Sequence, residues 1–327
     1  MELPVLDLRS PHLVQDLRVA ARDVGFFYLT GHGADAGLAR CLLDEAAAFF
    51  DLPTVQKQAV AMVNTRHFRG WTQLGDERTG GHIDWREQLD MGLDLPAIAL
   101  PPGAPAWQRL PGPNQWPLQR PRLRELSLQW QQQCQAIAWQ VLQTFALALQ
   151  QAPDCFTQLC QRQPQQVLKA IRYPGRDVAA DAQGCGAHKD SEFITLLWQD
   201  GVAGLQVQTD AGWVDAPPLP GCFVVNTGEL LELASQGYLR ATVHRVVAPP
   251  PGVVRHSLAY FLAARLDATV APLRLPPSLA AQVRGVDCDP ANPLLREVGP
   301  NTLKGRLRSH PDVAQRHYAD VLAGAAG

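Results

Sequence analysis

The chain has 327 residues, of which 46% are hydrophobic and 18% charged, and its formal net charge is −2. This globular balance excludes wholesale disorder and lacks the basic surface of a nucleic-acid or anionic-membrane binder. No apolar run reaches the ~20 residues of a membrane span, and the charged N-terminus is unlike a signal peptide. Seven cysteines without a CxxC pair favour reduced thiols. We therefore predict a cytoplasmic protein without nucleic-acid or membrane partners.

The N-terminal half predicts short strands that alternate with helices. Asp35 is placed to cap a helix that ends near Phe50. Residues 64–118 are rich in Gly, Pro and Trp and predict irregular covering structure. The other expected elements, in chain order, are a strand over 4–8, an amphipathic helix over 12–24, a buried strand over 25–29, a turn opened by Pro53 and a long helix over 120–151.

After Pro164 the pattern changes to short β-rich runs that are separated by turn residues, which is typical of a sandwich or barrel. The expected strands cover 167–173, 193–198, 204–207, 213–215, 222–225, 242–247 and 256–262. A basic helical tail begins near residue 300. The whole chain predicts an α+β fold with a mainly β core, divided into an N-terminal α/β cap over 1–118, a long helix and its support over 119–165, a β-roll over 166–275 and a C-terminal extension with a helix over 276–327.

Three His-x-Asp pairs could hold a metal, at 82–84, 188–190 and 310–312. On a strand, residues i and i+2 point to the same face, so both side chains of such a pair can reach one ion. Only the pair at 188–190 leads into a strong strand pattern, over 193–198. We therefore select His188 and Asp190.

A third ligand is expected later in the chain. His244 follows Asp190 by 54 residues and lies in a strand-like run. The interval holds three or four strands, enough for the chain to circle a roll and return beside the first strand. Two His and one carboxylate on one face of an ion form the facial triad of non-haem Fe(II) oxygenases. The alternative of unrelated polar residues stays open, and His82 and His310 are expected at the surface.

An anion site is indicated by the Arg-x-Ser run at 255–257. Strand alternation places Arg255 and Ser257 on one face, and an inward Arg is costly in a roll unless it meets an anion. A guanidinium binds a carboxylate bidentately, and a hydroxyl can add a further bond. Tyr173 could donate another. Alternatively, Arg255 pairs with a protein carboxylate. A short Pro/Gly turn suggests that the strands of His244 and Arg255 are adjacent.

The substrate pocket is expected to be lined by Phe261, Glu192, Lys169 and part of the 64–95 segment, notably Arg86. Phe261 shares the inward face of Arg255 by alternation. Glu192 shares the face of the metal carboxylate if the strand continues beyond it. Its carboxylate is either a solvated rim charge, paired with a nearby Lys or Arg, or a ligand for a cationic or hydroxylated substrate group.

Together these motifs resemble the isopenicillin N synthase-like branch of the Fe(II)/2-oxoglutarate-dependent dioxygenases. The resemblance rests on GFFYLTGHG at 25–33, GAHKD at 186–190, GLQV at 204–207, PG through NTGE at 220–229 and RHS at 255–257. It implies a double-stranded β-helix (jelly roll) that uses Fe(II), 2-oxoglutarate and O₂ to hydroxylate, desaturate or cyclise a small molecule. Ile171, Ser191 and Glu192 depart from the family pattern on the substrate side.

Three rival interpretations remain at this point. An oxidase like isopenicillin N synthase would keep the triad but use no 2-oxoglutarate, and Arg255 would hold a substrate carboxylate. A zinc hydrolase could use the same ligands, although the helical HExxH arrangement is missing. A non-catalytic roll would bind a metal or ligand only. The sequence does not indicate an oligomeric state.

Overall fold

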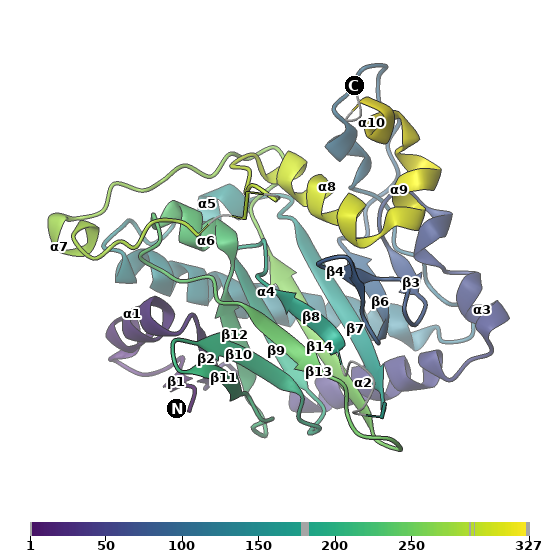
Figure 1. Ribbon diagram of the computed structural model, residues 1–327, viewed down its shortest axis with the longest axis horizontal. Coiled ribbons are helices and arrows are strands. Elements are labelled where there is room, and N and C mark those ends of the chain that lie inside the picture. The colour runs from purple at the N-terminus through teal and green to yellow at the C-terminus, as the bar shows by residue number, and fades with distance from the viewer. Residues whose placement is uncertain (1, 178–182, 288, 291, 325–327) are drawn as a thin grey trace.

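Two β-sheets lie face to face at the centre of the computed structural model (Figure 1), which describes residues 2–177, 183–287, 289–290 and 292–324. The larger sheet has the order β1-β2-β12-β9-β14-β7-β6-β3, and the smaller has the order β11-β10-β13-β8. The larger sheet consists of β1 (Val5–Asp7), β2 (Phe26–Thr30), β3 (Gly70–Thr72), β6 (Glu87–Gly92), β7 (Gln166–Pro174), β9 (Ile194–Gln199), β12 (Phe223–Thr227) and β14 (Val254–Leu262). The smaller sheet consists of β8 (Gln183–His188), β10 (Leu205–Thr209), β11 (Gly212–Asp215) and β13 (His244–Val247).

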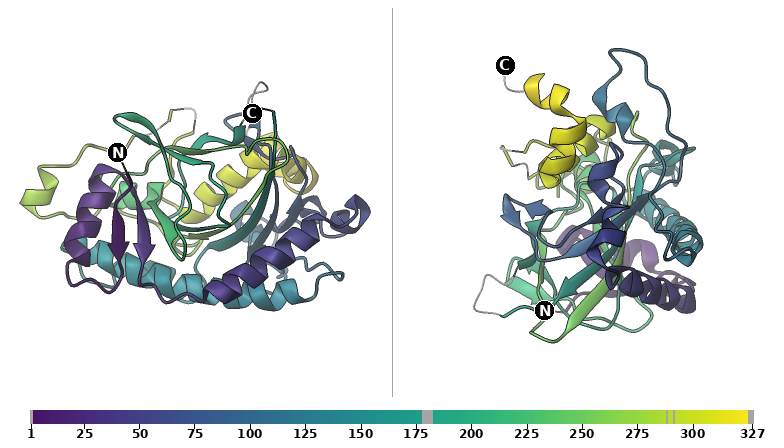
Figure 2. Two further views of the ribbon diagram at one scale, coloured as in Figure 1. Left: turned by 90° about the horizontal axis from the view of Figure 1, so that it is seen from below. Right: turned by 90° about the vertical axis from the view of Figure 1, so that its right-hand side faces the viewer.

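Helices cover the outer face of the larger sheet and the C-terminal side of the molecule (Figure 2). They are α1 (Leu13–Asp23), α2 (Ala36–Phe50), α3 (Thr54–Gln58), α4 (Arg122–Ala148), α5 (Thr157–Cys160), α6 (Glu229–Ala234), α7 (Pro277–Ala280), α8 (Val298–Ser309), α9 (Pro311–His317) and α10 (Ala319–Gly324). Two 3₁₀ helices, η1 (Met62–Asn64) and η2 (Ala106–Arg109), and the hairpin of β4 (Arg78–Thr79) and β5 (His82–Ile83) complete the elements. Among the described residues, no helix is both long and apolar enough to cross a bilayer.

Strand β14 shows how alternation builds the two halves of the core. Leu258 and Tyr260 point outward and pack with α1, α2 and α4, whereas Ala259 points inward into the cluster between the sheets. Each large apolar side chain that is fully buried in this way contributes about 1.5–3 kcal/mol. Arg255 and Ser257 have the inward parity of Ala259. The predicted inward face of this strand is therefore confirmed.

The local signals of the N-terminal half are confirmed. The carboxylate of Asp35 accepts hydrogen bonds from the backbone N–H of Gly37 at 2.8 Å and of Leu38 at 3.1 Å. This satisfies two N–H groups that the first turn of a helix leaves without partners. The helix α2 begins at the next residue and ends at Phe50, as the sequence predicts.

The prediction of irregular structure over 64–118 is wrong in part. Strand β6 lies in this segment, all six of its residues are buried, and it pairs antiparallel with β7. In its sequence, EQLDMG, only Leu89 and Met91 are large apolar residues, and the side chains of Glu87, Gln88 and Asp90 are buried in ion pairs and hydrogen bonds. Strand β8, rich in Gly, was not predicted as a strand either, and it forms beside β13.

The chain does circle and return as expected, since β13 pairs antiparallel with β8. The expectation that the strands of His244 and Arg255 are adjacent is wrong. The Pro/Gly turn between them carries the chain from the smaller sheet to the larger one, where β14 lies between β9 and β7. The two side chains therefore come from opposing sheets. The six cysteines that the structure describes are free, and Cys288 lies outside the described residues.

Candidate metal centre

Three side chains that are distant in the sequence meet at one end of the roll. His188 is the last residue of β8 and is the cross-strand partner of His244 in β13. Asp190 lies in the connection from β8 to β9, so the prediction that a continuing strand carries it is wrong. Its Oδ1 is 3.5 Å from Nε2 of His188 and 3.7 Å from Nε2 of His244. The ligand atoms of all three lie within 4.8 Å of one another, which suits one metal ion.

Backbone carbonyls set the tautomers of both imidazoles. Nδ1 of His188 donates to the carbonyl of Gly186 at 2.8 Å, and Nδ1 of His244 donates to the carbonyl of Thr242 at 3.1 Å. Since a carbonyl oxygen only accepts, each Nδ1 carries a proton, so the lone pair of each neutral imidazole lies on Nε2. Both lone pairs belong to the atoms that face Asp190, which is the arrangement that metal-ligating histidines use.

The Asp190 carboxylate is oriented by two donors. Its Oδ2 accepts from the Thr195 hydroxyl and, at 2.8 Å, from the amide of Asn226, and its Oδ1 faces the imidazoles. Burial raises the pKa of Asp190, but the neighbouring His244 and His188 outweigh this and hold that pKa below its usual range. Burial lowers the pKa of His244 to about 4. At neutral pH these two groups therefore hold the carboxylate and neutral imidazole that bind a cation.

Sequence reasoning did not single out Thr195 and Asn226. They are cross-strand partners in β9 and β12, so only the strand register brings them to the carboxylate. Of the rejected histidines, His82 is exposed as predicted. The prediction that His310 lies at the surface is wrong. It is buried beside Phe68, with Nε2 3.6 Å from the Glu77 carboxylate.

Arg255, the inward-pointing arginine of β14, has N–H donors that no protein acceptor satisfies. Arg255 is fully buried, and it donates from Nε to the Val202 carbonyl at 3.2 Å and from Nη2 to Oε1 of Gln199 at 2.9 Å. Its Nη1 and the hydroxyl of Ser257 are buried without a hydrogen-bond partner. No carboxylate of the described chain pairs with Arg255, which removes the alternative of a protein partner. Two orphaned donors on one face fit an external carboxylate.

Tyr173 is the cross-strand neighbour of Arg255, and the guanidinium carbon lies 5.0 Å from the centre of its ring. This distance allows a cation–π contact that supports the cation without using its donors. Burial raises the pKa of the Tyr173 phenol. A hydrogen bond from its hydroxyl to a cosubstrate stays a prediction.

Comparison with known proteins places this arrangement in a family. Residues 3–119 match the family described as non-haem dioxygenase in morphine synthesis N-terminal, and residues 161–264 match the 2OG-Fe(II) oxygenase superfamily. A 2-oxoglutarate-dependent dioxygenase from Dothideomycetidae sp. (strain 11243) is 33% identical over 98% of this chain and 94% of its own. The chain belongs to the Fe(II)/2-oxoglutarate-dependent dioxygenases.

Further relatives of this dioxygenase agree. A homoarginine-6-hydroxylase from Glycine max is 34% identical over 80% of each chain. The crystal structure of a 2OG-Fe(II) oxygenase family protein from Caulobacter crescentus aligns with a TM-score of 0.74 and 30% identity, over 94% of this chain and 98% of that one. The predicted jelly-roll fold is thereby confirmed. The dioxygenase uses Fe(II), 2-oxoglutarate and O₂ to oxidise a small molecule, and neither the oxidase nor the zinc hydrolase alternative is favoured.

A cavity of about 280 Å³ opens beside the triad of the dioxygenase. His188 and Asp190 line it, and so do the four residues expected around a substrate, Phe261, Glu192, Lys169 and Arg86. Glu192 is in the connection before β9 and not on a strand, so its place in the cavity does not follow from alternation. Glu229, which sequence reasoning missed, lines the same space from the first residue of α6.

The buried cations of this cavity, Arg86 and Lys169, are already paired. Glu77 lies 2.9 Å from Arg86 and 3.2 Å from Lys169, and these cations also lie 3.1 Å from Asp84 and 3.5 Å from Asp90, respectively. With Arg306, which lies 2.9 Å from Asp90, the three carboxylates and three cations are neutral as a group, so they contribute little free charge to the cavity. Glu77 belongs to the 64–95 segment that was expected to contribute to the cavity wall, but it was not named, and Asp84 supports Arg86 from behind the lining. A run of GDERTGGHID gave no periodic signal that would have placed them there.

The carboxylates of Glu192 and Glu229 differ from these paired groups. Neither forms an ion pair or a side-chain hydrogen bond within the described part of the chain. Burial, followed by the charge of Asp190, raises the pKa of Glu192. Burial also raises the pKa of Glu229, to about 7. The interpretation of Glu192 as a rim charge paired with a nearby Lys or Arg therefore finds no partner among the described residues.

Proposed function

We propose that this dioxygenase oxidises a small molecule that carries a positive charge, and that Glu192 and Glu229 bind that charge. The observation that carries this proposal is the pair of unpartnered carboxylates in a cavity whose cations are all engaged or lie at its exposed rim. The Glycine max relative is a homoarginine-6-hydroxylase, which supports a cationic substrate for this chain as well.

The chain's own residues fit the two groups that the family requires. We propose that His188, Asp190 and His244 hold Fe(II), since their ligand atoms converge and their other polar atoms are taken. We propose that Arg255 and Ser257 bind the far carboxylate of 2-oxoglutarate through the two orphaned donors. Fe(II), when bound, supplies oxygen activation, with electrons from the decarboxylation of 2-oxoglutarate to succinate and CO₂.

The remaining groups orient a substrate. Phe261 offers an apolar surface beside the metal ligands, and Glu192 and Glu229 offer carboxylates to an ammonium or guanidinium group. A guanidinium can bind both oxygens of one carboxylate, which fixes its orientation as well as its position. A neutral analogue would leave two half-buried carboxylates without a partner, so these residues also select against it.

The test is a substrate screen scored by succinate release above the uncoupled background. Cationic compounds such as homoarginine, arginine and lysine are compared with neutral analogues such as citrulline and norleucine. We expect coupled turnover only with cationic compounds. Coupled turnover of neutral analogues with equal kcat/KM would contradict the proposal.

Matched variants then test which residues bind the positive charge of the substrate. We expect Glu192→Gln and Glu229→Gln each to raise KM for the cationic substrate about tenfold or more, because each removes a charge-assisted hydrogen bond. Uncoupled 2-oxoglutarate turnover should persist. Glu125→Gln, on the exposed face of α4, is the control and should leave KM unchanged. An unchanged KM in both cavity variants would remove these residues from the substrate site. The cytoplasmic location and the absence of a nucleic-acid partner stay predictions.

A further inference from the structure

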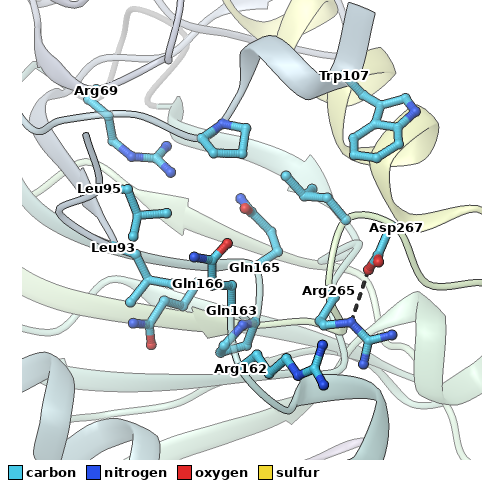
Figure 3. Close-up of a pocket in the computed structure, with 13 residues that line it drawn as sticks. Arg69, Leu93, Leu95, Trp107, Arg162, Gln163, Gln165, Gln166, Arg265 and Asp267 are labelled. Atoms are coloured by element: carbon cyan, nitrogen blue, oxygen red, sulfur yellow. Dashed lines mark hydrogen bonds and ion pairs between the residues drawn. The ribbon is translucent and has the colours of Figure 1, made fainter. Parts of the chain in front are cut away.

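A second cavity, of about 330 Å³, lies apart from the metal cavity and shares no lining residue with it. Its walls come from the segment before β3, from the segment after β6, from η2, from the start of β7 and the segment before it, and from the segment after β14. Figure 3 shows Arg69 and Gln165 pointing toward the same space, with Trp107 on the opposite side. This space is unrelated to the triad or to Arg255.

Arg69 is the unusual residue of this cavity. It is only 4% exposed, and no carboxylate of the described chain forms an ion pair with it. Its Nη1 donates to the carbonyls of His67 and Phe68, both at 3.2 Å. Its Nε is buried without a partner, and its Nη2 makes no hydrogen bond within the described residues. One edge of a buried guanidinium is thus left without an acceptor.

The site is built to hold this cation in place. A Cβ at Gly92 would lie 2.2–2.4 Å from Nη2, Nε and Cζ of Arg69, so only glycine leaves room for the guanidinium at the end of β6. Burial, followed by repulsion from Arg306, lowers the pKa of Arg69 to about 10. A buried charge without a partner is costly, and an anion in the cavity would remove that cost.

The acids nearby are already engaged. Asp90 lies 2.9 Å from Arg306 and 3.5 Å from Lys169. Asp267, on the cavity wall, pairs with Arg265 at 2.9 Å (Figure 3). Arg162 lies exposed at the rim and forms no ion pair within the described chain. The lining therefore carries an excess of positive charge.

The remaining lining suits an organic body with a polar head. Gln165 is buried, and its side-chain amide makes no hydrogen bond within the described residues. Leu93, Leu95 and Trp107 provide apolar surface. A cavity of about 330 Å³ is at the lower end of the range of small-molecule sites.

We propose that this cavity is a second ligand site, which binds a small organic anion with a carboxylate or phosphate head. The head accepts hydrogen bonds from the free edge of Arg69 and from the amide of Gln165. The apolar body lies against Trp107 and Leu93. The fork of a guanidinium matches two oxygens of either head group. The site therefore selects a negatively charged head with two oxygens that can bind side by side to one guanidinium edge.

The experiment is calorimetric titration of the anaerobic enzyme after it has been saturated with Fe(II) and 2-oxoglutarate, so that the Arg255 site is filled. The probes are benzoate, phenyl phosphate and the neutral benzyl alcohol. We expect one additional molecule of benzoate or phenyl phosphate per chain, and no binding of benzyl alcohol. The tighter of the two anions identifies the head group.

Variants decide whether Arg69 is the binding group. Arg69→Gln should weaken the anion about tenfold or more, and Gln165→Leu should weaken it by a smaller factor. Arg274→Gln, an exposed arginine outside the cavity, is the matched control and should bind like the parent. Each variant is first shown to bind 2-oxoglutarate like the parent, which demonstrates an intact fold. If Arg69→Gln does not fold, Gln165→Leu carries the test.

Three results would overturn the proposal. Neither anion binds at millimolar concentration, or the anion binds Arg69→Gln and Gln165→Leu as well as the parent, or benzyl alcohol binds as tightly as the anions. None of these results bears on whether Glu192 and Glu229 recognise a cationic substrate, because the two cavities share no residue.

Discussion

Two groups of buried charges include Lys169 of β7 and Arg255 of β14, and they differ in whether the protein provides their partners. Beside the metal cavity, Glu77, Asp84, Asp90, Arg86, Lys169 and Arg306 form a network in which each charge lies within 3.5 Å of an opposite one. On the inner face of β14, Arg255 and Ser257 keep donors without acceptors. Burial of a charge alone therefore does not mark a ligand site; Arg255 differs from the network because no carboxylate of the described chain pairs with it.

The network also explains how the N-terminal and C-terminal segments are joined. Glu77 and Asp90 precede the roll in the chain, Lys169 is in β7, and Arg306 is in α8. Such pairs contribute little net stability when intact, but removal of one partner leaves an uncompensated charge.

The largest effect is expected at the triad. His188→Ala, Asp190→Ala and His244→Ala should each lose most iron affinity and all coupled activity, because three ligands supply the protein's whole share of the coordination. Iron content per chain and succinate release measure this. His82→Ala is the control, since this histidine is exposed. Loss of iron in that variant, with iron retained in His188→Ala, would show that the wrong motif was selected.

The unpaired arginine should matter for 2-oxoglutarate. Arg255→Gln should weaken the binding of 2-oxoglutarate by ~3–5 kcal/mol, a hundredfold or more in affinity, because the cosubstrate carboxylate loses its charged partner. Arg255→Lys should recover part of this, since a point charge lacks the fork. Ser257→Ala should cost ~1–3 kcal/mol. Anaerobic titration of the Fe(II) enzyme, followed by the charge-transfer absorption band, measures all three. Equal affinities would assign the orphaned donors to another ligand.

The paired carboxylate of Glu77 should matter for the stability of the fold rather than for the binding of 2-oxoglutarate. Glu77→Gln leaves Arg86 and Lys169 short of a partner and should lower the free energy of unfolding by about 3 kcal/mol. Arg255→Gln in the absence of 2-oxoglutarate should change it by less than about 1 kcal/mol, because that arginine has no ion pair to lose. Chemical denaturation of the apo proteins gives both values. A larger loss of unfolding free energy in Arg255→Gln than in Glu77→Gln would contradict the difference between the unpaired and the paired charges.

The smallest expected effect is on the pH dependence of the unfolding free energy. Burial lowers the pKa of His310 to about 4, so the unfolded chain takes up this proton first as the pH falls. Its contribution to stability is therefore complete above the ordinary value of about 6.5 and is lost progressively between pH 6.5 and 4. We expect His310→Gln to reduce the loss of stability across this window by roughly 2 kcal/mol. Denaturation midpoints at several pH values test this, and parallel curves for parent and variant would contradict it.

Local chemistry predicted much of the fold correctly. Asp35 caps α2 because a short acidic side chain before an apolar periodic run satisfies the first N–H groups. The roll strands follow from turn residues and β-branched runs, whereas β6 was missed because it has no β-branched residue and buries polar and charged side chains beside Leu89 and Met91. The division of the chain at 118, 165 and 275 stays a prediction.

The sequence by itself determined the chemistry of the centre. A strong strand pattern selected His188 and Asp190 from three pairs, and alternation turned Arg255 inward, because both signals depend only on neighbours along the chain. Tertiary structure alone decided which buried charges are neutralised. The pairing of Glu77 with Arg86 and Lys169, and the absence of a carboxylate at Arg69, depend on segments that meet across the fold. Coulomb energy depends on distance in space, and no local pattern encodes that distance.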